Sequence, residues 1–443
     1  MSVITPVIKI GKKVKKKLIK PPELMLSPVR RIERVATEER LCAMTFDDGP
    51  FALPPSPSQS SQSLTDLLLD ILAKYDAKGT FDVVGDTSGN YPDEAGKLSS
   101  PSWGGIAYDH YPDIGQDHLG GVIACPDLVR RIIAEGHEVT NHGYAHILFG
   151  KKPLVYGKRQ YFKNIDEVIA DLRKLHDHME KEYSYTMKLS RPPHYVDNIA
   201  GGVNSYDAYQ QLGYQYMAAS FDGAGWLPRK TYEEEVGDTH LPLTRLLREN
   251  PDALCGQIIF QKDGYNMAKR TPIADGLEKQ LDLLKTYDYK VVTVSQLMEH
   301  SPFTDVSIDV KSAQSAKELL ALGKCLVYRD NSLRLYHLLT RGELAMVFFG
   351  IEQENHRLAL IRDKVPSKFS DIPTTHPYRA AIEFAVDEGY FTPNGNQFSP
   401  KETVSGDEFN AFCDQYYHAN CAIEGITMTH RAMIKAMKHL EHL

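Results

Sequence analysis

From about residue 40 to residue 300, the sequence alternates short apolar, β-branched runs with segments of helical periodicity. Seven runs are candidate strands: 42–46, 80–84, 138–141, 187–190, 215–219, 257–260 and 290–294. Between several of them lie segments whose apolar residues recur at intervals of three and four, at 64–74, 126–134, 165–179 and 273–285. Strands that alternate with helices predict a parallel sheet. Seven candidate strands suit a barrel-like closure better than a small open sheet, although periodicity alone does not decide between the two.

Composition and charge limit the function classes. The chain has 443 residues, 42% hydrophobic and 25% charged, which is typical of a globular protein of two or three domains. The net charge of -7 excludes a generally basic nucleic-acid binder. Residues 1–34 hold ten Lys and Arg but only two Asp and Glu. We interpret 1–37 as a basic, solvated extension, because it lacks the apolar stretch of a secretory signal and no segment reaches the ~20 apolar residues of a membrane span.

Beyond residue 301 the sequence changes to helical segments and polar turns with a weak internal repeat. The tetrapeptide at 303–306 recurs at 369–372, and the hexapeptide at 339–344 recurs at 404–409. A fainter third copy of the closing helix occupies 427–437. The repeat predicts a second, mainly helical domain over 302–443.

Two pairs of residues have the types and spacing of a metal site. Asp47 and Asp48 directly follow the first candidate strand, and adjacent carboxylates are costly unless a cation lies between them or their pKa values differ. His142 and His146 follow the 138–141 strand, and a spacing of four places both on one face of a helical turn. Two histidines and one carboxylate describe an open catalytic site that suits Zn²⁺.

The candidate polar residues share a position relative to the strands. Each lies just past the carboxyl end of a candidate strand, where a parallel β/α barrel builds its active site. They are Asp47, Asp48, His142, Arg191, Asp222 and Lys262. The sequence therefore predicts one site at that end of the sheet.

Four segments carry a family resemblance. TFDDGP at 45–50, HGYAH at 142–146, RPP at 191–193 and the segment 222–226 occur in the order and approximate spacing of the polysaccharide deacetylases. Residues 38–300 thus resemble the NodB-homology domain, or carbohydrate esterase family four. The resemblance implies an α/β fold with a distorted (β/α) seven-stranded barrel. It also implies a metal-dependent hydrolase, usually with zinc, that removes acetyl groups from a polysaccharide such as peptidoglycan, a chitin-like N-acetylglucosamine polymer or acetylated xylan.

The same resemblance implies a role for each matching residue. Asp48, His142 and His146 would bind the metal, and Asp47 would be the general base. Arg191, with help from Asp222, would orient Asp47. The remaining implied residues lie near the substrate: His194, whose backbone N–H would hold the oxyanion, Trp226, which would wall the acetyl pocket, and Tyr195.

Several positions depart from the family pattern, and one of them affects catalysis directly. Where the family has Leu-x-His, this chain has Phe-Gln-Lys at 260–262. Lys262 therefore replaces the histidine that is the family's usual general acid. Three interpretations remain open: Lys262 acts as the acid, His194 substitutes for it, or the protein is catalytically weak and only binds glycan. His194 stands where the family has an aromatic residue and Tyr195 where Gly is common, so we expect the substrate subsites to differ too. The family's second Asp in D-x-x-D-W is also lost and is Gly225 here.

The C-terminal repeats resemble surface-layer homology modules. Residues 369–408 cover one module, and the family's T-R-x-E motif is kept at Thr340, Arg341 and Glu343 but loses its Arg at 405–408. The resemblance implies binding to cell-wall polysaccharide and a location at the cell surface; the alternative is a helical domain that only stabilises the barrel.

The insertion 85–121 carries four aromatic residues that could stack on sugar rings or on one another: Tyr91, Trp103, Tyr108 and Tyr111.

Overall fold

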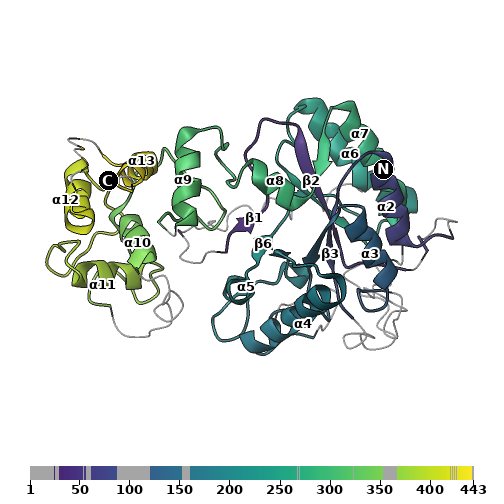
Figure 1. The fold of residues 1–443 in the computed structure, drawn as a ribbon, viewed down its shortest axis with the longest axis horizontal. Helices are drawn as coiled ribbons and strands as arrows, with labels where there is room; N and C mark the ends of the chain where they lie inside the picture. The colour runs from purple at the N-terminus through teal and green to yellow at the C-terminus, as the bar shows by residue number, and fades with distance from the viewer. Residues whose placement is uncertain are drawn as a thin grey trace, which may run out of the picture.

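The structure is a computed structural model of the 443-residue chain (Figure 1). It describes residues 24, 29–52, 54–55, 61–86, 120–151, 160–266, 268, 270–322, 324–352, 367–419, 421, 423, 425 and 427–441. Most of the basic extension and the aromatic residues of the 85–121 insertion lie outside these residues. In the described part of the chain, no helix is both long and apolar enough to cross a bilayer.

A parallel sheet forms the centre of the N-terminal part. Nine strands are found among the described residues, in the order β1-β6-β5-β4-β3-β2-β8-β7, with β9 also paired to β2. Every strand pairing is parallel, and the path starts at β1 and ends at β7 without pairing them, so the sheet is an open, curled half-barrel. Their bounds are β1 Arg31–Ile32, β2 Leu41–Asp47, β3 Thr80–Val83, β4 Glu138–Asn141, β5 Leu189–Ser190, β6 Gln215–Met217, β7 Phe221–Asp222, β8 Ile258–Lys262 and β9 Lys290–Val292.

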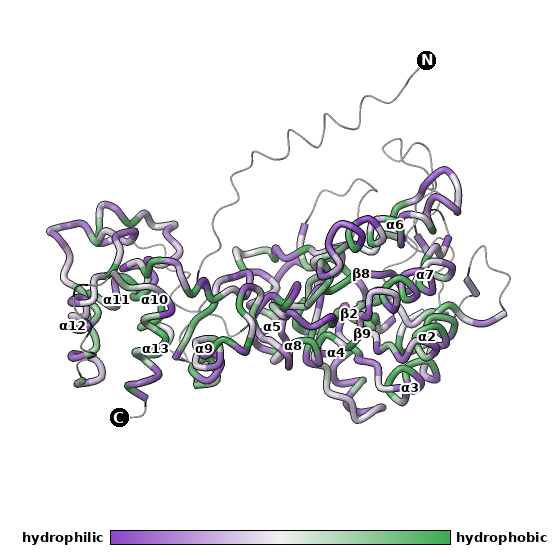
Figure 2. The backbone as a smooth tube through the Cα atoms, turned by 90° about the horizontal axis from the view of Figure 1, so that it is seen from above, coloured by the Kyte–Doolittle hydropathy of each residue, from purple (hydrophilic) through white to green (hydrophobic). Residues whose placement is uncertain are grey.

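The predicted strand and helix alternation is confirmed, and β1 and β7 add to the seven expected strands. The helices around the sheet are α2 Leu64–Lys74, α3 Pro126–Ala134, α4 Ile165–Tyr183, α5 Ser205–Leu212, α6 Tyr232–Glu249, α7 Pro272–Thr286 and α8 Val294–His300. Side-chain hydrogen bonds cap the N-termini of several of these helices. For example, Thr231 and Glu234 form a capping box at the start of α6. Each of these helices contains both polar and apolar residues, as expected for a helix that packs one face on the core and exposes the other (Figure 2).

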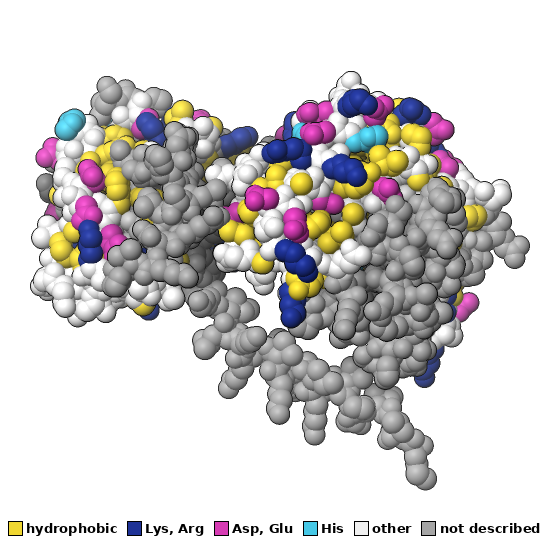
Figure 3. Space-filling model, turned by 90° about the horizontal axis from the view of Figure 1, so that it is seen from below, with side chains coloured by type: hydrophobic (Ala, Val, Ile, Leu, Met, Phe, Trp, Pro, Cys, Tyr) yellow, Lys and Arg dark blue, Asp and Glu magenta, His cyan; other side chains and the backbone are white. Residues whose placement is uncertain are grey.

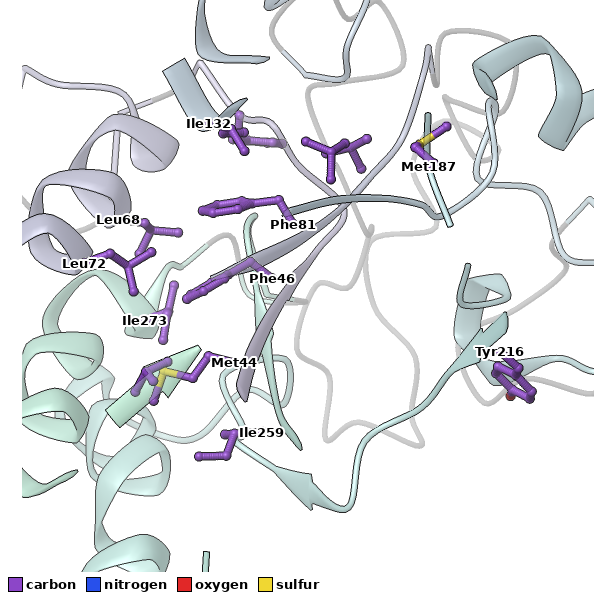
Figure 4. Close-up of a cluster of buried hydrophobic side chains, with 14 of the residues drawn as sticks. Met44, Phe46, Leu68, Leu72, Phe81, Ile132, Met187, Tyr216, Ile259 and Ile273 are labelled. Atoms are coloured by element: carbon purple, nitrogen blue, oxygen red, sulfur yellow. The ribbon is translucent and has the colours of Figure 1, made fainter. Parts of the chain in front are cut away.

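The core lies between β2, β3 and the helices that follow them. Phe46 and Phe81 stack with ring centroids 5.0 Å apart. Figure 4 shows both rings facing side chains from α2, α3 and α7. These neighbours include Leu68, Leu72, Ile132 and Ile273. Because this core fixes β2 and β3 side by side, it also fixes the positions of the residues at their carboxyl ends.

The C-terminal part has its own apolar core. Its helices, α9 Lys311–Ala321, α10 Arg341–Glu352, α11 Arg379–Asp387, α12 Gly406–Tyr417 and α13 His430–Leu440, gather at one end of the molecule (Figure 1). The three repeat copies meet through a cycle of backbone hydrogen bonds: Leu339 donates to Met428, Met428 to Val404, and Val404 to Leu339, at 2.8–2.9 Å. The faint third copy is therefore a structural equivalent of the other two. The exact domain boundaries stay a prediction.

Candidate active site

The segment TFDDGP forms a sharp turn at the end of β2. Asp47 is the last residue of the strand, and Asp48 has a left-handed backbone with φ 80°. A Cβ at Gly49 would lie 2.1 Å from the Asp263 carboxylate, so only glycine fits at that position. The turn gives the two adjacent carboxylates different partners, as the contacts below show.

The segment 142–146 is a loop and not the helical turn that the spacing of the histidines predicted. Gly143 has φ 90° and His146 has φ 55°, which no α-helix allows. The Asp171 carboxylate of α4 accepts hydrogen bonds from the backbone N–H groups of Tyr144 and Ala145, at 2.8 and 3.1 Å. These bonds hold the loop in a shape that still brings both histidines to one point.

Asp48, His142 and His146 converge as predicted. The Nε2 atoms of His142 and His146 lie 3.3 and 3.1 Å from the same oxygen, Oδ1 of Asp48, and all three residues are buried. Tetrahedral Zn²⁺ with bonds of about 2.0–2.2 Å separates two ligand atoms by about 3.3–3.6 Å. The donor types and spacing of this group therefore fit a single divalent cation.

The charges of these three residues differ in a way that suits metal binding. Burial alone would raise the pKa of Asp48, but Lys262 and the two histidines hold it well below its usual range. Burial lowers the pKa of His146 to about 4, so its imidazole is neutral at pH 7. Burial opposes protonation of His142 too, yet Asp82, Asp48 and Asp47 raise its pKa well above the usual value. A cation bound beside Asp48 would compete with that proton for the same nitrogen.

Asp47 is paired with Arg191 instead. The guanidinium of Arg191, which is fully buried, donates from Nη1 to Asp47 Oδ1 and, at 2.9 Å, to Thr45 Oγ1. Its other nitrogens donate to the carbonyls of Met217 and Ala218. Burial raises the pKa of Asp47 to about 6, although Arg191 and His142 lower it. A carboxylate with a pKa close to neutral and a fixed orientation suits a general base.

Lys262 and His194 each lie next to one of the three predicted metal ligands. Lys262 ends β8, in register with Asp47, and its buried Nζ contacts the second oxygen of Asp48, Oδ2. His194 lies in the short turn Pro193–Tyr195, half-buried, with its ring centroid 5.2 Å from that of His146. The ring of Tyr195 lies 5.3 Å from the Arg191 guanidinium. The structure thus brings both candidate acids to the site but pairs one of them with a predicted ligand.

Asp222 and Trp226 form a separate pair. Asp222 is exposed, and its carboxylate accepts hydrogen bonds from Trp226 Nε1 at 3.0 Å and from Ala224 N at 2.8 Å. Arg191 donates to Thr45, Asp47 and two carbonyl groups, so its orientation is explained without Asp222. The expected help from Asp222 stays a prediction.

Sequence reasoning missed several residues that hold the site together. Asp82 of β3 contacts His142, Asp171 holds the histidine loop, and Asp263 accepts a hydrogen bond of 2.7 Å from Thr65 beside Gly49. Burial raises the pKa of Asp263 to about 7. A carboxylate inside an apolar strand, as in TFDVV at 80–84, is the signal that could have identified Asp82.

Comparison with known families agrees with this geometry. Residues 34–217 match the model of the polysaccharide deacetylase family, a range that includes Asp47, Asp48, both histidines and Arg191. These residues form a polysaccharide deacetylase domain. Residues 368–409 match the S-layer homology domain. The predicted family resemblances of both parts are therefore confirmed, and Asp222 and Lys262 lie beyond the first match.

Several relatives are about a quarter identical to this chain over the aligned residues. It is 25% identical over 267 residues to the peptidoglycan-N-acetylmuramic acid deacetylase PdaC of Bacillus subtilis, covering 60% of this chain and 40% of that protein. It is 25% identical over 270 residues to the peptidoglycan-N-acetylglucosamine deacetylase of Bacillus cereus, covering 60% of this chain and 92% of that protein. The chitin deacetylase of Colletotrichum lindemuthianum is 26% identical over 267 residues, covering 60% and 82%.

Among solved structures, the chitin deacetylase of Colletotrichum lindemuthianum is similar at 23% identity and a TM-score of 0.40, covering 61% of this chain and 92% of that one. A family 4 acetyl xylan esterase from Clostridium thermocellum, in complex with a cobalt ion, is 20% identical with a TM-score of 0.38, covering 61% and 96%.

Proposed function

We propose that this chain is a metal-dependent deacetylase that removes N-acetyl groups from a polysaccharide such as peptidoglycan or a chitin-like polymer. The observation that carries the proposal is the separation of two adjacent carboxylates, with Asp48 facing the histidine pair and Asp47 paired with Arg191. The peptidoglycan and chitin deacetylases among its relatives support the substrate class.

Asp48, His142 and His146 would hold the divalent metal, most simply Zn²⁺. When bound there, such an ion supplies a Lewis acid for the acetyl carbonyl and a water of lowered pKa. Asp47 takes the proton of the attacking water, and Arg191 keeps its carboxylate in place. The backbone N–H of His194 would donate a hydrogen bond to the developing oxyanion.

The leaving amine must also receive a proton, and we propose His194 as its donor. Its imidazole is half-buried beside His146, so a bound sugar can reach it. Lys262 is 4% exposed, and its ammonium contacts Asp48. If His194 is the acid, H194Q lowers kcat more than K262M does; a larger loss in K262M would assign the proton to Lys262.

The Lys262–Asp48 contact favours a second candidate function. A buried ammonium beside the one carboxylate of the proposed ligand group reduces the negative charge available to a cation. The alternative is therefore a glycan-binding protein with weak or absent turnover, in which the site recognises acetylated sugars but does not hydrolyse them.

Amine release from acetylated chitooligosaccharides and from purified peptidoglycan separates the two functions. The full chain is stripped with a chelator and assayed with and without added Zn²⁺. We expect turnover that requires the metal and is lost in D47N, whereas E138Q, which changes a buried carboxylate at the other end of β4, behaves as the unmodified chain. Zinc binding without turnover on any acetylated glycan would contradict the enzyme and support the binding protein.

For the C-terminal part, we propose binding to cell-wall polysaccharide. The match to the S-layer homology domain supports it, and Arg341 of the T-R-x-E motif stacks 4.9 Å from the Phe398 ring. Its Nη1 also lies 3.5 Å from Glu408, so an anionic sugar group would compete with this carboxylate. Sedimentation with purified cell walls tests the proposal: we expect the full chain to co-sediment and R341A to do so less. Equal sedimentation of both would contradict this role of Arg341.

A further inference from the structure

Asp82 is a buried carboxylate behind the histidine pair to which the reaction above gives no role. It lies within β3, fully buried, where every other residue of Thr80–Val83 is uncharged. One of its oxygens, Oδ1, accepts a hydrogen bond of 2.6 Å from Thr140, its register partner on β4. The other, Oδ2, lies 2.8 Å from Nδ1 of His142. The two strands therefore aim one oxygen of Asp82 at one nitrogen of a proposed metal ligand.

The two nitrogens of the His142 ring have separate surroundings. Nε2 lies 3.3 Å from Asp48 Oδ1, on the side of His146. Nδ1 forms a hydrogen bond of 2.9 Å with the carbonyl oxygen of Arg191 and lies 2.8 Å from Asp82 Oδ2, a buried acceptor with no hydrogen-bond partner among the described residues. A nitrogen between two acceptors carries the hydrogen, and the neutral ring then presents the lone pair of Nε2 towards Asp48.

A carboxylate does more at Nδ1 than the carbonyl alone can do. It fixes the ring's tautomer and orientation, and its negative charge makes the opposite nitrogen a stronger electron-pair donor. We propose that Asp82 is a positioning residue for His142, which holds Nε2 ready for a divalent metal and strengthens its bond to that metal. This inference rests on the proposed metal site and goes beyond it by assigning a residue outside the ligand group.

Asp82 could instead be a ligand itself, since Asp47, Asp82 and His142 also offer donor atoms within 4.8 Å of one another. The neighbours of this second group argue against it. The Arg191 guanidinium donates to Asp47, and the Arg191 carbonyl already faces Nδ1. A cation there would have to lie next to a fixed positive charge, whereas the group around Asp48 offers two imidazole nitrogens around one oxygen.

The test measures metal affinity and not turnover. Zn²⁺ dissociation constants are determined by competition with a chromophoric chelator for the full chain and for D82N, T140V, D48N and E138Q. D82N keeps the shape of Asp82 but removes its charge, and we expect it to weaken binding roughly 10- to 100-fold. T140V removes only the hydrogen bond that holds Asp82, so we expect a smaller loss in the same direction. E138Q is the matched control on the neighbouring strand and should leave affinity unchanged.

A spectroscopic measurement distinguishes positioning from ligation and from a general loss of structure. In ¹⁵N-labelled, metal-free protein at a pH high enough to leave the ring neutral, His142 should carry its hydrogen on Nδ1, and D82N should show a mixture of tautomers. With Co²⁺ bound, D82N should keep the unmodified chain's absorption bands, because the ligands are the same. Altered bands would make Asp82 a ligand and overturn the inference.

Three further results would also overturn it. If the unmodified chain binds Zn²⁺ tightly and D48N does not, but D82N matches E138Q, the positioning role is wrong while the proposed metal site stands. If the unmodified chain binds no divalent metal, both fail. If D82N does not fold, T140V decides alone, and unchanged affinity in T140V would contradict the inference.

Discussion

At the scale of single residues, the two adjacent carboxylates make the sharpest prediction. Asp47 and Asp48 are neighbours in the chain, yet one is paired with Arg191 and the other faces two histidines. D47N should therefore lower kcat about 100- to 10,000-fold while zinc affinity stays close to that of the unmodified chain. D48N should lose zinc affinity and, with it, turnover. Assays of turnover and zinc titration on both variants check this, and equal zinc loss in both would mean that the two carboxylates are not separated.

The proposed functional difference between Asp47 and Asp48 could be predicted from the sequence because short motifs indicate it. TFDDGP, the spacing of His142 and His146, and the position of Arg191 at a strand end all point to one edge of the sheet. The sequence could not show that the Lys262 ammonium contacts Asp48, since that contact depends on the register between β2 and β8. Asp82 was missed for the same reason: only the pairing of β3 with β4 shows that it faces a histidine.

At the scale of elements, the loop that carries His146 depends on a helix far from it in sequence. Asp171 of α4 accepts two backbone hydrogen bonds from this loop, and nothing in the spacing of the histidines indicates that contact. D171A should free both donors, lower stability by about 1–3 kcal/mol and weaken zinc binding. Chemical denaturation and zinc titration measure the two effects. D166A, which changes an exposed carboxylate in the first turn of the same helix, serves as the control. Unchanged zinc affinity in D171A would show that the loop holds its shape without Asp171.

The buried His137, which directly precedes β4, leads to a prediction of how the free energy of unfolding depends on pH. His137 is buried, accepts a hydrogen bond of 2.9 Å from Gly79 N, and has its pKa lowered to about 4 chiefly by burial. Between pH 6.5 and about 4 the unfolded chain binds this proton and the folded chain does not, so stability falls as pH falls through that window. The loss attributable to His137 is about 3 kcal/mol. Unfolding free energies measured from pH 7 to pH 4 should fall less steeply in H137N, which keeps an acceptor but cannot be protonated. Parallel curves for the two proteins would contradict this assignment.

At the scale of the whole molecule, the chain crosses between its two parts more than once. The repeat in the sequence predicted a separate helical part, and the cycle through Leu339, Val404 and Met428 confirms three equivalent copies. The sequence did not predict that Leu24, near the other end of the chain, packs into the same C-terminal core and donates its N–H to Tyr378 Oη at 2.9 Å. Nor did it predict β1, which pairs only two residues with β6. Both contacts join segments that are far apart in the sequence, and each involves only one or two residues of the N-terminal segment. The spacing of apolar residues in the sequence therefore does not indicate them.

On the face seen in Figure 3, the described residues mix positive and negative side chains over both parts. The described residues of this face form no single-sign patch that would steer a highly charged polymer, so the glycan binding proposed above would depend there on particular residues near each site. For the C-terminal part, that makes the integrity of its core decisive, because its motif residue Arg341 packs against Phe391 and Phe398 of the core.

Leu24 should therefore matter to wall binding and not to the deacetylase site. It is 3% exposed, and L24A should lower the stability of the C-terminal part by about 2–3 kcal/mol through the cavity that it leaves. Hydrogen exchange should increase in α10 to α13 but not in α4, while zinc affinity stays unchanged. L175A, which makes the same change in the barrel core on α4, should give the opposite pattern. Faster exchange in α4 of L24A, or loss of its zinc binding, would mean that the two cores unfold as one unit.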